Sequence, residues 1–144
     1  MPPGRFVSGV TQGFRFVGVC VPWKDAHVNT GRKDRRTWQD HRAYLGGLVK
    51  VITPDSKTPT ILLGDFNQRT PRLYSPADVY EQFVGTVSKD FWISTAGVLE
   101  PISEPSIDHI CFNPKPARFT VRTLDKTQHG VRLSDHFGLV AEFE

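Results

Sequence analysis

Short apolar runs along the chain predict a series of β-strands. Residues 14–21 (FRFVGVCV) are apolar on both faces beyond Arg15 and stop at Pro22, and residues 60–63 (TILL) form a short apolar run that stops at Gly64. Such runs without alternation are typical of buried strands. Four later runs have strand length and β-favouring composition, with Pro and Gly between them: residues 91–95, 107–112, 119–124 and 139–143. We therefore expect the last third of the chain to be mostly sheet.

Two segments between these strands have helical spacing instead. From about residue 33 to residue 52, apolar side chains recur at helical intervals, at Trp38, Leu45, Leu48, Val49 and Ile52. A second helix is predicted with Ser75 as its N-cap and Pro76 at its first position. Its apolar face consists of Val79, Phe83, Val84 and Val87. Two helices between strands, followed by a β-rich run, predict one layered α/β (α+β) domain over residues 1–144.

Composition agrees with a folded domain and limits its surroundings. The chain has 144 residues, 38% hydrophobic and 23% charged, which is typical of a folded protein. Its apolar runs are far shorter than the roughly 20 residues that span a bilayer, so we expect no membrane span. Residues 1–13 show no secretion signal, and Cys20 and Cys111 are too few and too far apart for a disulfide framework or a zinc site. A reducing, cytoplasmic location is expected.

The net charge is mildly basic. A formal charge of +3 and a pI near 9.0 favour phosphorylated or polyanionic partners, nucleic acid among them. Part of this charge is local, at Arg32, Lys33, Arg35 and Arg36. A solvated helix start explains that run at least as well as a phosphate-binding patch does.

Three segments combine acidic residues with Asn or His where predicted strands begin or end. They are residues 64–67 (GDFN), 107–110 (IDHI) and 134–136 (SDH). Taken singly, the first is most often a turn, the second is a surface pair on a strand, and the third is an ordinary loop. Their oxygen and imidazole groups nevertheless suit phosphoester hydrolysis, which needs a hard cation, a base for water and groups that bind phosphoryl oxygens. Carboxylates favour Mg²⁺ or Mn²⁺ over zinc.

Taken together and in this order, the segments resemble the endonuclease/exonuclease/phosphatase superfamily. The resemblance lies in residues 61–68 (ILLGDFNQ), 106–112 (SIDHICF) and 133–143 (LSDHFGLVAEF). It implies a four-layer α/β/β/α sandwich, of which this chain would be the C-terminal half, with a mostly antiparallel sheet and about two helices. It also implies a metal-dependent phosphoester hydrolase that uses Mg²⁺ or Mn²⁺.

The resemblance also implies roles for five residues. Asp65 would orient or deprotonate the attacking water, and Asn67 would hold a phosphate oxygen or the metal shell. Asp135 would be the metal-binding carboxylate, with Asp65 and Asn67 near the metal. His136 would contact the scissile phosphate, and Asp108 would accept its hydrogen bond, which favours a charged imidazole able to stabilise the transition state. His109 is interpreted as structural or as support for these residues.

Two positions, Cys20 and His27, do not follow the family pattern. Cys20 stands near the place where the family usually has a catalytic His or Tyr, and a buried, inert cysteine is the commoner meaning of such a position. His27 in the next loop is a hypothetical substitute for phosphate contact. A rim formed by Arg32, Arg35, Arg36 and His41 is a further hypothesis, although a solvated helix face is preferred.

An expected contribution of the other half of the fold is missing from the sequence. The N-terminal half would supply an Asn and a metal-binding Glu, and residues 1–13 contain no Glu, Asp or Asn. Three hypotheses follow: a piece of a phosphoesterase, a half-site completed by a partner or by a second copy, or a non-catalytic remnant that binds phosphorylated ligands or protein. We prefer the first and expect weak or no activity from these residues alone. DNA, RNA, lipid and small phosphoesters all stay open as substrates.

Overall fold

A five-stranded sheet forms the centre of the computed structural model, which describes residues 4–28 and 34–144. Its strand order is β1-β2-β3-β5-β4. The strands are β1 (Phe6–Thr11), β2 (Phe14–Cys20), β3 (Thr60–Asp65), β4 (Trp92–Ile93) and β5 (Asp108–Asn113). Only β2 and β3 run parallel, and the other neighbours are antiparallel. The mixed α/β class and the mostly antiparallel sheet are as predicted.

Strand β1 was not predicted. It pairs with β2 as a hairpin whose two turn residues, Gln12 and Gly13, have φ values of 50° and 79°. Positive φ at both positions matches the twist of a two-residue hairpin. The apolar residues of β1 are few and Val7 and Val10 are exposed, which explains why the pattern is weak in the sequence.

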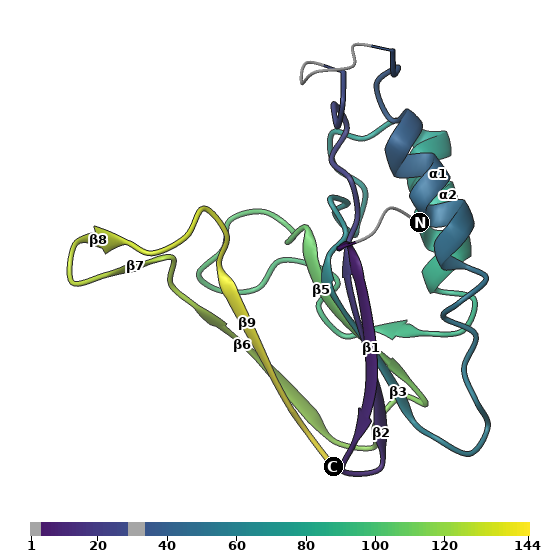
Figure 1. Cartoon of the computed structure of the whole chain (residues 1–144). Coiled ribbons are helices and arrows are strands. Elements are labelled where there is room, and N and C mark those ends of the chain that lie inside the picture. Colours follow the sequence, from purple (N-terminus) through teal and green to yellow (C-terminus); the bar gives the residue numbers. More distant parts are fainter. Residues whose placement is uncertain (1–3, 29–33) are drawn as a thin grey trace.

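Helices α1 (Gln39–Leu48) and α2 (Ala77–Val87) lie together on one face of the sheet (Figure 1). The main core forms between them and this face. On the sheet it includes Val17, Val19, Leu62 and Cys111, and on the helices it includes Tyr44, Leu45, Leu48, Phe83 and Val87. Side chains alternate along a strand, so the intervening residues of β2, β3 and β5 point to the opposite face.

Both predicted helix starts need correction. The first helix begins at Gln39 and not near residue 33, because Trp38 has a left-handed φ of 68° that a continuing helix does not allow. Residues 29–33 lie outside the described part of the chain. The second helix begins at Ala77, with Pro76 in the extended N-cap position, and Ser75 makes no capping hydrogen bond.

The C-terminal part forms an arm beside the main sheet. Strands β6 (Phe119–Leu124) and β9 (Gly138–Phe143) pair antiparallel, and the short strands β7 (Thr127–Gln128) and β8 (Val131–Arg132) form the tip of the arm (Figure 1). Aromatic contacts join the base of the arm to the sheet: the ring centroids of Phe143 and Phe112 are 4.9 Å apart, and those of Trp92 and Phe119 are 4.4 Å apart.

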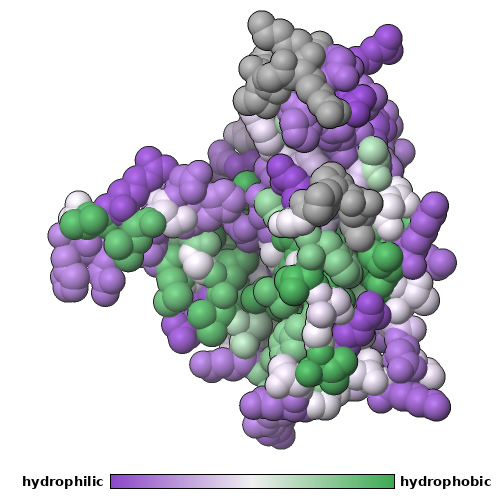
Figure 2. All heavy atoms as spheres, in the orientation of Figure 1, coloured by the Kyte–Doolittle hydropathy of each residue, from purple (hydrophilic) through white to green (hydrophobic). Residues whose placement is uncertain are grey.

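The face of the sheet opposite the helices carries half-buried apolar side chains. They include Phe14, Phe16, Leu63 and Ile110. Figure 2 shows a hydrophobic surface over the body and the adjoining arm. Among the described residues, none of the helices has the length and apolar character needed to cross a bilayer.

Candidate functional site

Three predicted residues meet at one end of the central sheet. Asp65 is the last residue of β3 and is paired with Asp108, the first residue of β5, while Cys20 at the end of β2 is aligned with Asp65 on the other side. All three point away from the helices because their neighbours Val19, Gly64 and His109 take the helix-facing positions. Strand register alone therefore brings together two segments more than 40 residues apart.

A tight turn fixes the Asp65 carboxylate. Asp65 Oδ1 accepts the backbone N–H of Asn67 at 2.8 Å, and Oδ2 accepts the Asn67 side-chain amide at 2.9 Å. The same amide donates to the Val21 carbonyl at 2.9 Å, which ties the turn to β2. Gly64, with a φ of 134°, is required here because a Cβ atom would lie 2.0 Å from the Val19 carbonyl oxygen.

Burial acts on the charge of Asp65. It raises the pKa of this carboxyl, and the nearby Asp108 adds to the effect, whereas the hydrogen bonds from Asn67 and the charge of His136 oppose it. The net change is a raised pKa. A carboxylate with a raised pKa accepts a proton more readily, as a general base requires.

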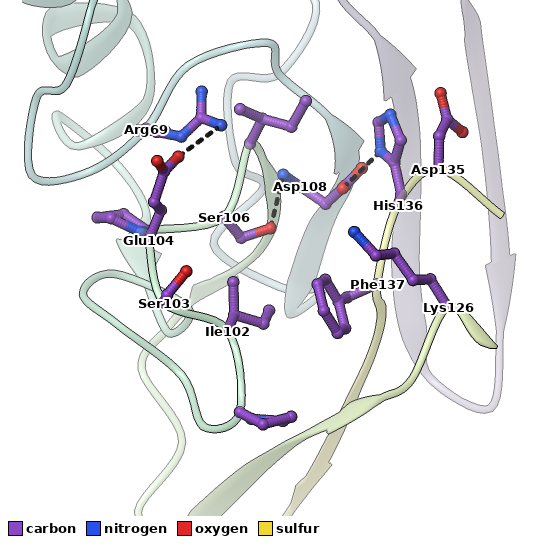
Figure 3. Close-up of a pocket in the computed structure, with 13 residues that line it drawn as sticks. Arg69, Ile102, Ser103, Glu104, Ser106, Asp108, Lys126, Asp135, His136 and Phe137 are labelled. Carbon is purple, nitrogen blue, oxygen red and sulfur yellow. Dashed lines mark hydrogen bonds and ion pairs between the residues drawn. The ribbon is translucent and has the colours of Figure 1, made fainter. Parts of the chain in front are cut away.

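His136 and Asp108 form the predicted pair. The Nδ1 atom of His136 donates to Asp108 Oδ2 over 2.8 Å (Figure 3). Backbone contacts hold both residues, since Ser106 Oγ accepts the Asp108 N–H and Ser134 Oγ accepts the His136 N–H, each at 3.0 Å. The fold thus joins the start of β5 to the loop before β9.

The pair favours a charged imidazole. Burial lowers the pKa of His136, but the hydrogen bond that His136 donates to Asp108 and the charges of Asp108, Asp65 and Asp135 outweigh it, so the net pKa is raised. Burial also raises the pKa of Asp108 against the opposing effect of His136. The shared hydrogen bond leaves Nε2 of His136 as the ring nitrogen that can reach a ligand.

An open cavity of about 380 Å³ contains this pair and Asp135. Two cations also line it: Arg69, which is 3.2 Å from Glu104, and Lys126, whose Nζ atom lies 5.0 Å from the centre of the Phe137 ring (Figure 3). Sequence reasoning missed Arg69, Lys126, Ser106 and Phe137. Arg69 follows Asn67 by two positions and Phe137 follows His136 directly, whereas nothing in the sequence marks Lys126.

The metal-binding prediction depends on how many oxygen ligands gather here. Asp135 accepts no hydrogen bond within residues 4–28 and 34–144, but both oxygens of Asp65 are engaged by Asn67. The described residues contain no group of three or more His, Cys, Asp or Glu side chains placed to hold a metal ion. The donors match a hard cation in kind, but these residues do not make a complete site for it.

A buried polar network supports the site from behind. The Nε2–H of His109 donates to the Gln68 carbonyl at 2.9 Å, and the Thr95 hydroxyl lies 2.9 Å from His109 Nδ1. The Nδ1–H of His41 donates to the Pro22 carbonyl at 2.8 Å, and the Gln68 side chain lies 3.2 Å from His41 Nε2. The network fixes Gln68, the residue next to Asn67.

Several predicted positions lie away from the cavity. His41 is fully buried, so both the preferred solvated helix face and the rim hypothesis are wrong for it. His27 is exposed and bonded to Asp40 at 2.7 Å, and Arg35 lies 3.4 Å from the same carboxylate. Cys20 is exposed, not buried as expected, and Arg5 donates to its Sγ at 3.4 Å. Arg32 and Lys33 fall outside the described residues.

Two solved structures are similar to this chain. One is an endonuclease/exonuclease/phosphatase family protein from Leptotrichia buccalis, with 16% identity and a TM-score of 0.46 over 96% of this chain and 53% of that one. The other is a mannosyl-6-phosphatase from Bacteroides thetaiotaomicron, with 20% identity and a TM-score of 0.45 over 89% of this chain and 49% of that one. The chain spans about half the length of these structures. No protein-family model and no curated protein matches it.

Proposed function

We propose that the cavity around Asp108 and His136 is part of a phosphoester hydrolase site. The observation that carries this proposal is the 2.8 Å contact between His136 and Asp108, with Asp135, Lys126 and Arg69 in the same cavity. A charged imidazole and two further cations can hold a phosphoryl group and stabilise the negative charge that it develops.

The other residues have complementary parts in the proposed reaction. Asp65 takes the proton of the attacking water, and Asn67 keeps the Asp65 carboxylate oriented. Asp108 holds His136 in the tautomer that presents Nε2 to a phosphoryl oxygen. The bond between phosphorus and the leaving oxygen then breaks as the new bond to water forms. Asp135 is the carboxylate that this chain would supply to Mg²⁺ or Mn²⁺, which would polarise the phosphoryl oxygens when bound.

A second candidate is a site that binds phosphorylated ligands without turnover. The incomplete set of metal ligands favours it, because the described residues contain no group of three or more His, Cys, Asp or Glu placed to hold a metal ion. A further segment or partner that covers the apolar sheet face would complete the site in the first case and would only hold the ligand in the second. Both candidates use the same cations and the same His136–Asp108 pair.

Hydrolysis of bis(p-nitrophenyl) phosphate with Mg²⁺ or Mn²⁺ tests the proposal. We expect weak turnover that is lost with EDTA and falls roughly a hundredfold in His136→Ala, as for other groups that stabilise transition-state charge. His129→Ala and Asp34→Ala are matched controls, since both residues are exposed and lie outside the cavity. Turnover that survives His136→Ala and Asp135→Ala would overturn the assigned roles. Phosphate binding without turnover in either metal would favour the second candidate.

A further inference from the structure

A second cavity of about 330 Å³ adjoins the candidate site. Arg69 and Ile107 line both cavities and form the wall between them. Beyond this wall lie the aromatic rings of Trp23, Trp38 and Tyr74. These residues come from the loop after β2, the start of α1 and the loop between β3 and α2. The function proposed above uses Asn67 and Arg69 from the lining of this cavity but assigns no part to its aromatic residues.

Two of these aromatic residues have an unfavourable, left-handed backbone conformation. Six non-glycine residues among positions 4–28 and 34–144 have positive φ, and three of them line this cavity: Trp38 at 68°, Tyr74 at 68° and Asn67 at 50°. Bulky residues rarely adopt this conformation, and such outliers concentrate at functional sites. Two aromatic outliers beside one cavity therefore indicate that ring placement matters there.

Neighbouring groups hold two of the rings in position. The backbone N–H of Trp38 donates to the Lys24 carbonyl at 2.6 Å, which fixes its main chain, and the Trp38 ring meets the buried His41 ring edge-on with centroids 5.1 Å apart. The Tyr74 hydroxyl donates to Glu104 at 2.9 Å, and the Arg69 guanidinium lies 5.4 Å from the centre of the Tyr74 ring. Glu104 and Arg69 line the first cavity, so the two sites share supports.

Buried polar atoms beside the rings have no partner in the described structure. They are Gln68 Oε1, Arg69 Nε and Ser75 Oγ, all from residues that line the aromatic cavity. Gln68 is only 1% exposed, and its amide nitrogen is engaged with His41. Buried polar groups are normally hydrogen-bonded, and an unpaired one costs stability. Each atom has almost no solvent-accessible surface, so a rotation of the Gln68, Arg69 or Ser75 side chain would present it to the edge of a ligand in the cavity.

We propose that the aromatic cavity binds a flat heterocyclic ring of the nucleobase type, carried by the phosphoester whose phosphate occupies the first cavity. This inference rests on the proposed function. A planar base has two apolar faces for stacking and polar atoms only at its edge, which matches three aromatic rings with a few buried polar atoms. A sugar ring can also stack its C–H face on an aromatic ring, but its peripheral hydroxyls need more hydrogen-bonding partners than these three atoms supply. Arg69 in the shared wall lies between base and phosphate.

Calorimetric titration of the whole chain with adenosine tests this inference without any phosphate chemistry. We expect measurable binding that weakens roughly tenfold in Tyr74→Ala and in Trp23→Leu, as stacking contacts do when removed. Tyr74 is 75% exposed and Trp23 is 48% exposed, so both variants should fold, and their thermal melts check this. Tyr74→Phe keeps the ring and loses only the hydroxyl, so it should bind adenosine within about twofold of the parent chain.

The outcomes separate the two proposals. Absence of adenosine binding, or equal binding by Tyr74→Ala, Trp23→Leu and the parent chain, would overturn the aromatic-cavity inference even if the phosphodiester is hydrolysed. Binding of glucose through the same residues, without adenosine binding, would overturn it as well. If the chain binds adenosine but His136→Ala hydrolyses the phosphodiester as fast as the parent chain, the aromatic-cavity inference is supported and only the proposed function is overturned.

Discussion

Acid should destabilise the protein through the buried residue His109. Its side chain is 1% exposed and stacks on Phe83, with ring centroids 5.8 Å apart. The Ile110 N–H donates to Thr95 Oγ1, so the Thr95 hydroxyl proton is free to point at His109 Nδ1 while Nε2–H donates to the Gln68 carbonyl. This arrangement satisfies the neutral imidazole, whereas a second proton on Nδ1 would force the Thr95 hydroxyl to turn its own proton away from His109.

The expected magnitude follows from the pKa of His109. Burial lowers this pKa from 6.5 to about 4, against the opposing hydrogen bond to Gln68. The unfolded chain therefore binds more protons than the folded one between these values. The contribution of neutral His109 to the free energy of unfolding is fully present above pH 6.5 and is lost as the pH falls towards 4. The whole interval corresponds to about 3 kcal/mol of unfolding free energy, of which about 2 kcal/mol is lost between pH 7.5 and pH 5.

Urea denaturation at these two pH values measures the effect. The matched variant is His109→Gln, whose amide can still donate to the Gln68 carbonyl but does not titrate. His41, whose pKa burial also lowers, contributes in the same direction in both proteins and cancels in the comparison. We expect the parent chain to lose about 2 kcal/mol more than the variant on acidification. Equal losses would refute the neutral, buried state of His109.

Three further outcomes are expected. Gly64→Ala should lower the unfolding free energy by about 3 kcal/mol or more, because the added Cβ would collide with the Val19 backbone. Gly46 lies within α1 and has open space around its Cβ position, so Gly46→Ala should raise the unfolding free energy by roughly 0.5–1 kcal/mol. Urea denaturation measures both changes. Asn67→Ala should lower phosphodiester turnover roughly tenfold, because it frees the Asp65 carboxylate, and unchanged turnover would contradict that role. The chain should self-associate as its concentration rises, and Leu63→Lys should reduce this in light scattering, because Leu63 is a half-buried residue of the apolar sheet face opposite the helices. A parent chain that stays monomeric would contradict the expectation that this apolar face needs a cover.

The sequence predicts the buried strands well because their apolar runs are continuous. The runs at residues 14–21 and 60–63 became β2 and β3, whereas the run at 119–124, which matches β6, is largely exposed. The family resemblance of the three polar motifs also implies that Asp108 and His136 meet. The register of β3 with β5 then adds Asp65, because the last residue of one strand faces the first residue of the other.

Other features depend on contacts that no local pattern encodes. Trp38 fits the helical spacing of its neighbours, yet its backbone turns left-handed where its N–H meets the Lys24 carbonyl, and the helix starts one residue later. His41 has the sequence context of a surface residue but is buried against Pro22 and Gln68. Lys126 reaches the cavity only because the β6–β9 arm folds back beside the start of β5.

A Mn²⁺ titration monitored by NMR tests the placement of the phosphoester site most directly, because it does not require turnover. In the presence of inorganic phosphate, we expect Mn²⁺ to broaden the backbone signals of Asp135, His136 and Asp65 first, and Asp135→Ala to abolish this at the same metal concentration. His129, at the exposed turn between β7 and β8, should keep its signal in both proteins. Broadening centred elsewhere, or unchanged in Asp135→Ala, would contradict the placement of the phosphoester site.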